Sequence, residues 1–139
     1  MPDELLMIAR LLLAGALGGL IGFQRERVGK EAGIRTLALI SIGSALFTVL
    51  SISGFDAPDP SRVAANIVVG IGFLGAGAII HRDQGVIEGM TTAATIWVAA
   101  AIGIAAGTGL SFIAVAATAI VLVVLVLPHV HSDQGSTKK

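Results

Sequence analysis

Long apolar runs alternate with short polar connectors along almost the whole chain. The five runs cover approximately residues 5–23, 34–53, 62–80, 90–107 and 110–127. A helix needs about 20 consecutive apolar residues to cross the apolar core of a bilayer. The pattern therefore predicts an all-α integral membrane protein, with five transmembrane helices in one domain (residues 1–128) and a short tail (residues 129–139).

The connectors differ in charge, and this predicts an orientation. The connector between the first two runs carries Arg25, Arg27, Lys30 and Arg35, whereas residues 54–61 contain acidic residues and no lysine or arginine. Short loops rich in basic residues stay in the cytoplasm. We therefore expect the N-terminus to lie outside and the C-terminus to lie in the cytoplasm.

Composition excludes several classes of function. The 139 residues are 55% apolar and 13% charged, against about 25% charged in ordinary soluble domains. The formal net charge is zero and no basic stripe with interleaved aromatics is present, so we expect no nucleic-acid partner. There is no cysteine, and two histidines in a terminal tail, His129 and His131, rarely form a metal site. Because the five helices use nearly the whole chain, we expect no enzymatic activity, cofactor or metal.

Glycine is concentrated in the third run. Gly70 and Gly77 fall on one side of a helix, and Gly72 and Gly75 fall on nearly the opposite side. Glycine costs about 1 kcal/mol relative to alanine in a helix in water, but in a bilayer it lets helix backbones touch. We therefore predict that this helix is contacted from two directions. The letters G-x-G-x-x-G also occur here, but no strand precedes them, so packing is the better interpretation.

A second glycine stripe lies on the first run. It consists of Gly15, Gly18, Gly19 and Gly22. We expect the first, third and fourth helices to form the buried core through these glycine faces. When the chain is compared with itself at one fixed offset, Gly19 aligns with Gly75 and Thr36 aligns with Thr92. This alignment raises the hypothesis of a parallel repeat, in which helices 1 and 2 correspond to helices 3 and 4.

Few polar residues lie within the runs. The second run carries a face of hydroxyl groups from Ser41, Ser44, Thr48 and Ser51. These hydroxyls either bond to backbone carbonyls or to a neighbouring helix, or they line a permeation path. Asn66 is either an anchor between helices or part of a site, and Arg10 either extends to the outer surface or joins an ion pair or site. No Asp, Glu, Lys or His lies in the middle third of any run, which argues against an ion-coupled carrier.

Opposite charges gather in the two predicted inner loops. One loop carries Arg25, Glu26, Arg27, Lys30, Glu31 and Arg35, and the other carries Arg82, Asp83 and Glu88. Exposed ion pairs contribute about 0–1 kcal/mol each. The loops therefore form either a solvated, cross-paired rim or a surface on which another protein docks.

Six motifs occur in order and without large gaps between them. They are Leu20–Arg27, Lys30–Thr36, Gly43–Thr48, Asp59–Ala65, Gly70–Gly77 and Gly89–Trp97. Together they closely resemble the MgtC/SapB family. The candidate functional polar residues, most of them in these motifs, are Arg25, Glu26, Arg27, Arg35, Thr36, Ser44, Arg62, Asn66, Thr91, Thr92 and Trp97.

The resemblance implies a multi-pass protein of the bacterial inner membrane, with five spans. It also implies a link to growth at low magnesium and, in pathogens, to survival inside phagocytes. Members resemble regulators that act on other membrane proteins, including the ATP synthase, more than they resemble magnesium carriers. Our hypothesis is therefore a non-enzymatic regulator of magnesium homeostasis or membrane energetics that contacts the bilayer and other membrane proteins. The alternative is a small ion or solute transporter or channel subunit, and a homo-oligomer is compatible with both.

Two features depart from the family pattern. Many members carry a soluble cytoplasmic domain after the fifth span, whereas only residues 129–139 follow it here. Thr91 stands where the virulence-associated branch tends to have asparagine. A role in virulence is therefore not part of the hypothesis.

Overall fold

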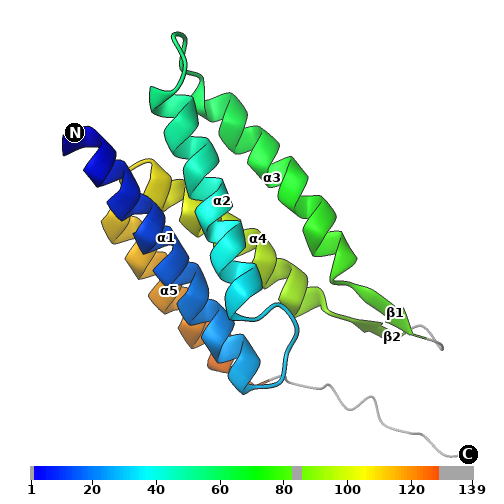
Figure 1. The fold of residues 1–139 in the computed structure, drawn as a ribbon. Helices are drawn as coiled ribbons and strands as arrows, with labels where there is room; N and C mark the ends of the chain where they lie inside the picture. Colours follow the sequence, from blue (N-terminus) through cyan, green and yellow to red (C-terminus); the bar gives the residue numbers. More distant parts are fainter. Residues whose placement is uncertain (1, 83–85, 129–139) are drawn as a thin grey trace, which may run out of the picture.

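The computed structural model describes residues 2–82 and 86–128, which form five helices and a short hairpin (Figure 1). The elements are α1 (Pro2–Arg27), α2 (Ile34–Ser53), α3 (Pro60–Gly77), β1 (Ile80–Arg82), β2 (Val86–Glu88), α4 (Met90–Gly107) and α5 (Ser111–Val126). Helices α1 to α4 are long and apolar enough to cross a membrane, and α5 is a shorter apolar helix of 16 residues. The prediction of an all-helical protein with membrane-spanning helices is confirmed at this level.

The hairpin lies where the sequence predicted only a loop. Strands β1 and β2 pair antiparallel, with Ile80 opposite Glu88, and α3 ends at Gly77 rather than near Ile80. The hairpin returns to α4 through Gly89, whose φ is 90°. A Cβ at Gly89 would collide with the carbonyl group of Ala78, so only glycine fits this turn.

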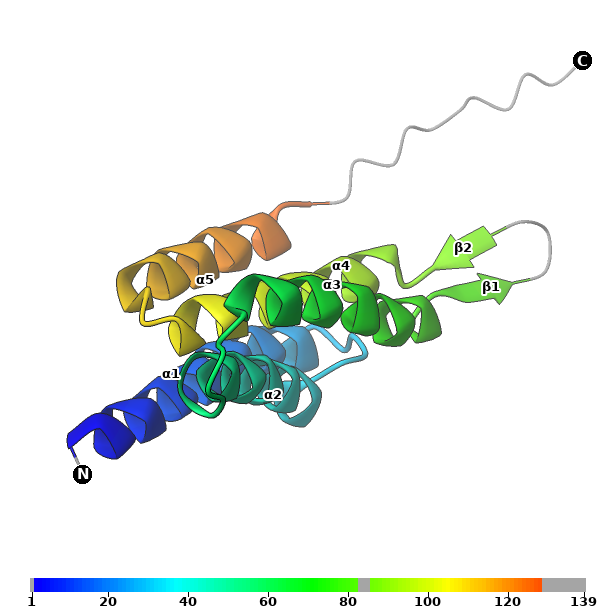
Figure 2. The ribbon, with the colours of Figure 1, turned by 90° about the horizontal axis from the view of Figure 1, so that it is seen from above.

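Helix α2 packs against both α1 and α4, and these three helices form the core of the bundle. Its buried residues are Leu37, Ser41, Ser44, Ala45, Thr48, Val49 and Ser51, whereas the buried residues of α3 are Ile71 and Gly75. Seen from above, α4 lies between α3 and α5, while α1 and α2 form the adjacent layer (Figure 2). The expectation that the first, third and fourth helices form the core is wrong, because α2 and not α3 packs with both α1 and α4.

Glycines of α1 and α4 allow both helices to approach the backbone of α2. A Cβ added to Gly18 would lie 2.5 Å from the carbonyl oxygen of Leu37, and one added to Gly107 would lie 2.8 Å from the carbonyl oxygen of Ala45. A Cβ at Gly103 would collide with the carbonyl oxygen of Ser41. Backbone atoms cannot rotate away as side-chain ends can, so a larger residue would push the helices apart.

The rest of the α1 stripe also faces α2. A Cβ added to Gly22 would lie 2.5 Å from Cα of Ile34, and one added to Gly15 would meet the side chain of Ile42 at 2.9 Å. Gly19 is less constrained, because its added Cβ would lie 3.9 Å from the side chain of Ile34. The stripe on α1 therefore packs against α2, not against α3.

The glycines of α3 are mostly open. Among the described residues, no atom lies within 4 Å of a Cβ added to Gly70, Gly72 or Gly77. Gly75 makes an ordinary contact with α4, since its added Cβ would lie 3.6 Å from the carbonyl oxygen of Ala93. Helix α3 contacts α4 and, less closely, α2, but the close packing predicted on both of its glycine faces is not present among the described residues, because α3 diverges from α2 toward the hairpin (Figure 1).

This difference between glycines is testable by substitution with alanine. We expect Gly103→Ala to lower the free energy of unfolding by about 1–3 kcal/mol, because the added methyl group meets the backbone of α2. The matched variant Gly70→Ala should leave it unchanged or raise it by up to about 1 kcal/mol, since alanine is the better helix former. Reversible unfolding of both variants in mild detergent measures the difference. Equal losses in the two variants would contradict this packing.

Candidate functional site

A buried arginine lies at the end of the bundle where α1 ends and α4 begins. Arg25 is only 4% exposed, and its Nη2 donates a hydrogen bond to Oγ1 of Thr92 at 2.5 Å. Its Nε is also buried and has no hydrogen-bond partner among the described residues. Burying a charge is costly unless an opposite charge lies nearby. In residues 2–82 and 86–128 no carboxylate forms an ion pair with Arg25, so Thr92 is the partner that the described residues give this buried guanidinium.

The neighbouring carboxylate of Glu26 has a structural role. Its Oε1 accepts a hydrogen bond from the backbone N–H of Ile34 at 3.0 Å. Residue Gly33, at the N-cap of α2, has no side chain that could do so, and a Cβ there would collide with Glu26. A carboxylate is favourable at this position, because the first turn of a helix has free N–H groups and a partial positive charge.

The other charged candidates of the first inner loop are exposed. The guanidinium of Arg27 lies 5.7 Å from the ring centroid of Phe23, and Arg35 is exposed at the start of α2. Within the described ranges neither forms an ion pair. The predicted pairing between the two inner loops stays a prediction, because Asp83 lies outside the described residues.

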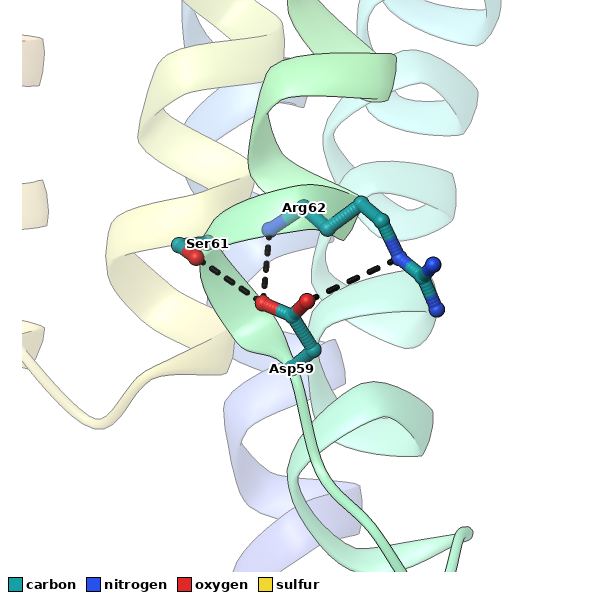
Figure 3. A network of polar contacts seen from close by, with 3 residues as sticks. All are labelled: Asp59, Ser61 and Arg62. Carbon is teal, nitrogen blue, oxygen red and sulfur yellow. Dashed lines mark hydrogen bonds and ion pairs between the residues drawn. The ribbon is translucent and has the colours of Figure 1, made fainter.

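Arg62 lies at the opposite end of the bundle, where α3 begins (Figure 3). Asp59 caps this helix, accepting hydrogen bonds from the hydroxyl of Ser61 at 2.9 Å and from the backbone N–H of Arg62 at 3.1 Å. The Nε of Arg62 lies 3.6 Å from the same carboxylate. The pKa of the Asp59 carboxyl lies below its usual value, mainly because of the hydrogen bond from Ser61 and secondly because of the bond from the Arg62 N–H. Arg62 therefore helps to hold Asp59 in place as the N-terminal cap of α3.

The hydroxyl face of α2 is turned toward its neighbouring helices. The Cβ of Ser41 would lie 2.8 Å from a Cβ at Gly18, and the Cβ of Ser44 would lie equally close to one at Gly103. Thr48 occupies the equivalent place opposite Gly107, and its hydroxyl donates to the carbonyl of Ser44 at 2.7 Å. Of the two interpretations of this face, contact between helices agrees with the geometry.

A groove between α2 and α3 brings several predicted residues together. It consists of two adjoining hollows of about 690 and 620 Å³. Both hollows are lined by Leu39, Ile40 and Leu74. The polar residues along the groove are Glu31, Thr36 and Thr92 in the first hollow, and Ser44 and Asn66 in the second. The fold thus collects polar residues of three helices and one loop along a mostly apolar groove, which we call the α2–α3 groove.

Two candidates of the last motif lie away from the groove lining. Trp97 is 53% exposed on α4. Thr91 is partly exposed, and its carbonyl accepts a hydrogen bond from the hydroxyl of Thr95 at 2.7 Å. Of this motif, only Thr92 combines burial, a partner on another helix and a place in the groove.

Arg10 has a role that sequence reasoning missed. Its Nη1 donates to the carbonyl oxygen of Gly107 at 3.2 Å, where α4 ends. Carbonyl groups in the last turn of a helix lack internal partners and carry a partial negative charge. The sequence signal for this contact was the glycine-rich link around Gly109. Gly109 has a φ of 88°, and its lack of a side chain leaves room for the guanidinium of Arg10.

The capping role of Glu26 leads to a prediction. We expect Glu26→Ala to lower the free energy of unfolding by about 1 kcal/mol, the usual cost of losing a helix N-terminal cap. Glu31→Ala is the matched control, because Glu31 lies in the same loop and has no hydrogen bond or ion pair within residues 2–82 and 86–128. Urea unfolding in mild detergent compares the two. If Glu31→Ala cost as much as Glu26→Ala, the cap would not explain the loss.

Comparison with known proteins adds independent information. The chain matches the model of the MgtC family over residues 11–133. It is 45% identical over 130 residues to the Escherichia coli K12 protein named "Putative magnesium transporter YhiD", covering 88% of this chain and 60% of that protein. It is 48% identical over 114 residues to Protein MgtC of Brucella abortus, covering 81% of this chain and 48% of that protein.

A third relative, an uncharacterized protein of Haemophilus influenzae, is 44% identical over 131 residues, covering 88% of this chain and 55% of that protein. The chain thus spans about half the length of the curated relatives it matches. No solved structure matches the chain.

Proposed function

Because the chain belongs to the MgtC family, we propose that it is a non-enzymatic, multi-pass protein of the bacterial inner membrane that regulates magnesium homeostasis or membrane energetics. It acts through contacts with other membrane proteins. One relative is named for magnesium transport and one as MgtC, and neither name is that of an enzyme. The relatives are longer than this chain, so the activity of the whole relatives is attributed to this chain only as a proposal.

The proposed topology has five spans, with the N-terminus outside and the C-terminus in the cytoplasm. The basic residues of the first loop, Arg25, Arg27, Lys30 and Arg35, support a cytoplasmic position for the end where α1 stops and α2 starts. Helix α5, with 16 residues, is about 24 Å long. It is therefore shorter than the apolar core and crosses with local thinning of the bilayer.

The observation that carries the regulatory proposal is the packing of the hydroxyl face of α2. The Cβ atoms of Ser41, Ser44 and Thr48 pack against glycines of α1 and α4, and the Thr48 hydroxyl donates within its own helix, which favours a packing role for this face over an open path. The exposed side of α3 offers a surface for partners, since Val69 is 76% exposed and Phe73, which also lines the α2–α3 groove, is 82% exposed. Small residues beside exposed apolar ones are typical of contacts between membrane helices. Such a contact is available to another membrane protein or to a second copy of the chain.

A transport function is the second candidate, and one observation favours it. Ser44 and Asn66 line the same hollow of about 620 Å³, so polar groups of α2 and α3 face a common space. The name of the Escherichia coli relative points the same way. A carrier or channel would use this hollow as part of its path.

Reconstitution into liposomes distinguishes the two functions. We expect vesicles containing the purified chain to take up magnesium no faster than protein-free vesicles, measured with an enclosed fluorescent magnesium indicator. Ser44→Ala and Asn66→Ala should then have no effect on this background rate. A saturable flux that either substitution abolishes would overturn the regulatory proposal in favour of a transporter.

A further inference from the structure

The α2–α3 groove is apolar along most of its length and polar at the end near α4, and neither of the two proposed functions accounts for this difference. Most of its lining is apolar, including Leu39, Ile40 and Leu74, which line both hollows. The groove is open along its side, and it lies between two helices that are long and apolar enough to cross a membrane. In a bilayer this side faces lipid. An acyl chain, which needs no hydrogen bonds, suits such a surface.

The end of the groove near α4 favours a negative group. Thr92 is 5% exposed and lines the groove, and its hydroxyl oxygen accepts a hydrogen bond from Arg25. Among the described residues no acceptor takes the hydroxyl hydrogen of Thr92, which is therefore available for donation. Helix α4 begins here without a side-chain cap, because its N-cap is Gly89. Uncapped N–H groups and the buried, partly unpaired guanidinium of Arg25 together attract an oxyanion such as a phosphate.

The same hollow also contains a carboxylate. Glu31 lines it together with Thr92, is exposed, and forms no ion pair with any described residue. A ligand that carries only negative charge would be repelled by Glu31, whereas one with an ammonium group beside its phosphate would satisfy both ends. Opposite charges placed in this way select for a zwitterion.

We propose that the α2–α3 groove binds a phosphatidylethanolamine-type lipid. The phosphate accepts from Thr92 and faces the first turn of α4, the primary ammonium donates to Glu31, and one acyl chain lies along Leu39, Ile40 and Leu74. Gly43 and Gly70, which face no atom within 4 Å, keep the second hollow open to this chain. The inference rests only on the membrane position in the proposed function, not on the choice between regulator and transporter.

Native mass spectrometry of the full chain in mild detergent tests the proposal. Dioleoyl phosphatidylethanolamine, dioleoyl phosphatidylglycerol and the soluble headgroup glycerophosphoethanolamine are added in parallel. We expect phosphatidylethanolamine to bind at least about tenfold more tightly than the other two, because only it satisfies the charges and the apolar groove. Thr92→Val and Glu31→Gln should each weaken its binding about tenfold, the effect of losing a hydrogen bond to a charged group.

Two variants control for damage to the fold. Thr92→Ser keeps the hydroxyl and should bind the lipid as tightly as the unmodified chain. Thr95→Val removes a hydroxyl that bonds within α4 and lies outside the groove lining, so binding should again be unchanged. Thermal unfolding of each variant identifies a loss of binding that merely follows a loss of structure.

Several results would overturn the proposal. These are equal binding of phosphatidylglycerol, equal binding of the soluble headgroup, lipid binding that Thr92→Val and Glu31→Gln both leave unchanged, or a stable dimer that excludes the lipid. The measurement uses no magnesium, and the liposome assay uses no lipid competition. Failure of the lipid site and failure of the regulatory function are therefore distinguishable.

Discussion

The close approach of α1 and α4 to the backbone of α2 is the contact on which the rest of the structure depends. It needs glycine at Gly18 and Gly22 on one side and at Gly103 and Gly107 on the other, because a Cβ at any of them would meet an atom of α2 at 2.8 Å or less. Lipid is as apolar as leucine, so burial from water does not hold membrane helices together, and close packing has to do so. The backbone and small side chains of α2 fill the space that these four glycines leave, and this contact provides the close packing.

Two arginines of α1 depend on this arrangement. Arg10 binds the carbonyl of Gly107, where α4 ends, and Arg25 binds the hydroxyl of Thr92, where α4 begins. Both bonds form only if residues 10–25 of α1 lie beside residues 92–107 of α4. The first bond places a cation at the favourable end of the α4 dipole. The second places one at the unfavourable end, which makes the Arg25 end of the bundle the natural position for an anionic ligand.

Helix α3 stands apart from this core, and its position creates the groove. It packs on α4 around Gly75 and diverges from α2, so the space between α2 and α3 stays open along one side. Gly70, Gly77 and the exposed Phe73 line this groove, and Val69 of the same helix is exposed as well. The two proposals, contacts with lipid and with other membrane proteins, both rest on this arrangement of a packed core of α1, α2 and α4 beside an accessible helix.

The sequence predicted the class of the fold well, because apolar runs of spanning length are a strong signal. It placed α3 instead of α2 in the core, since the spacing of Gly15 to Gly22 shows that the stripe packs but not which helix it meets. The bond between Arg25 and Thr92 joins residues 67 positions apart, and only the tertiary arrangement brings them together. Thr36, Ser44, Asn66 and Thr92 were all candidates from sequence, but that they share one groove follows from the divergence of α3.

Disulfide cross-linking in membrane vesicles tests the place of α2 in the core most directly, since the chain has no cysteine of its own. A Cβ at Gly15 lies 3.0 Å from Cγ1 of Ile42, and this contact involves only the side chain that the substitution replaces. The pair therefore lies within the range for a disulfide. We predict rapid cross-linking in Gly15→Cys/Ile42→Cys and none in Gly15→Cys/Gly70→Cys. Cross-linking of Gly15→Cys with Gly70→Cys, without the α2 pair, would contradict this account and return α3 to the core.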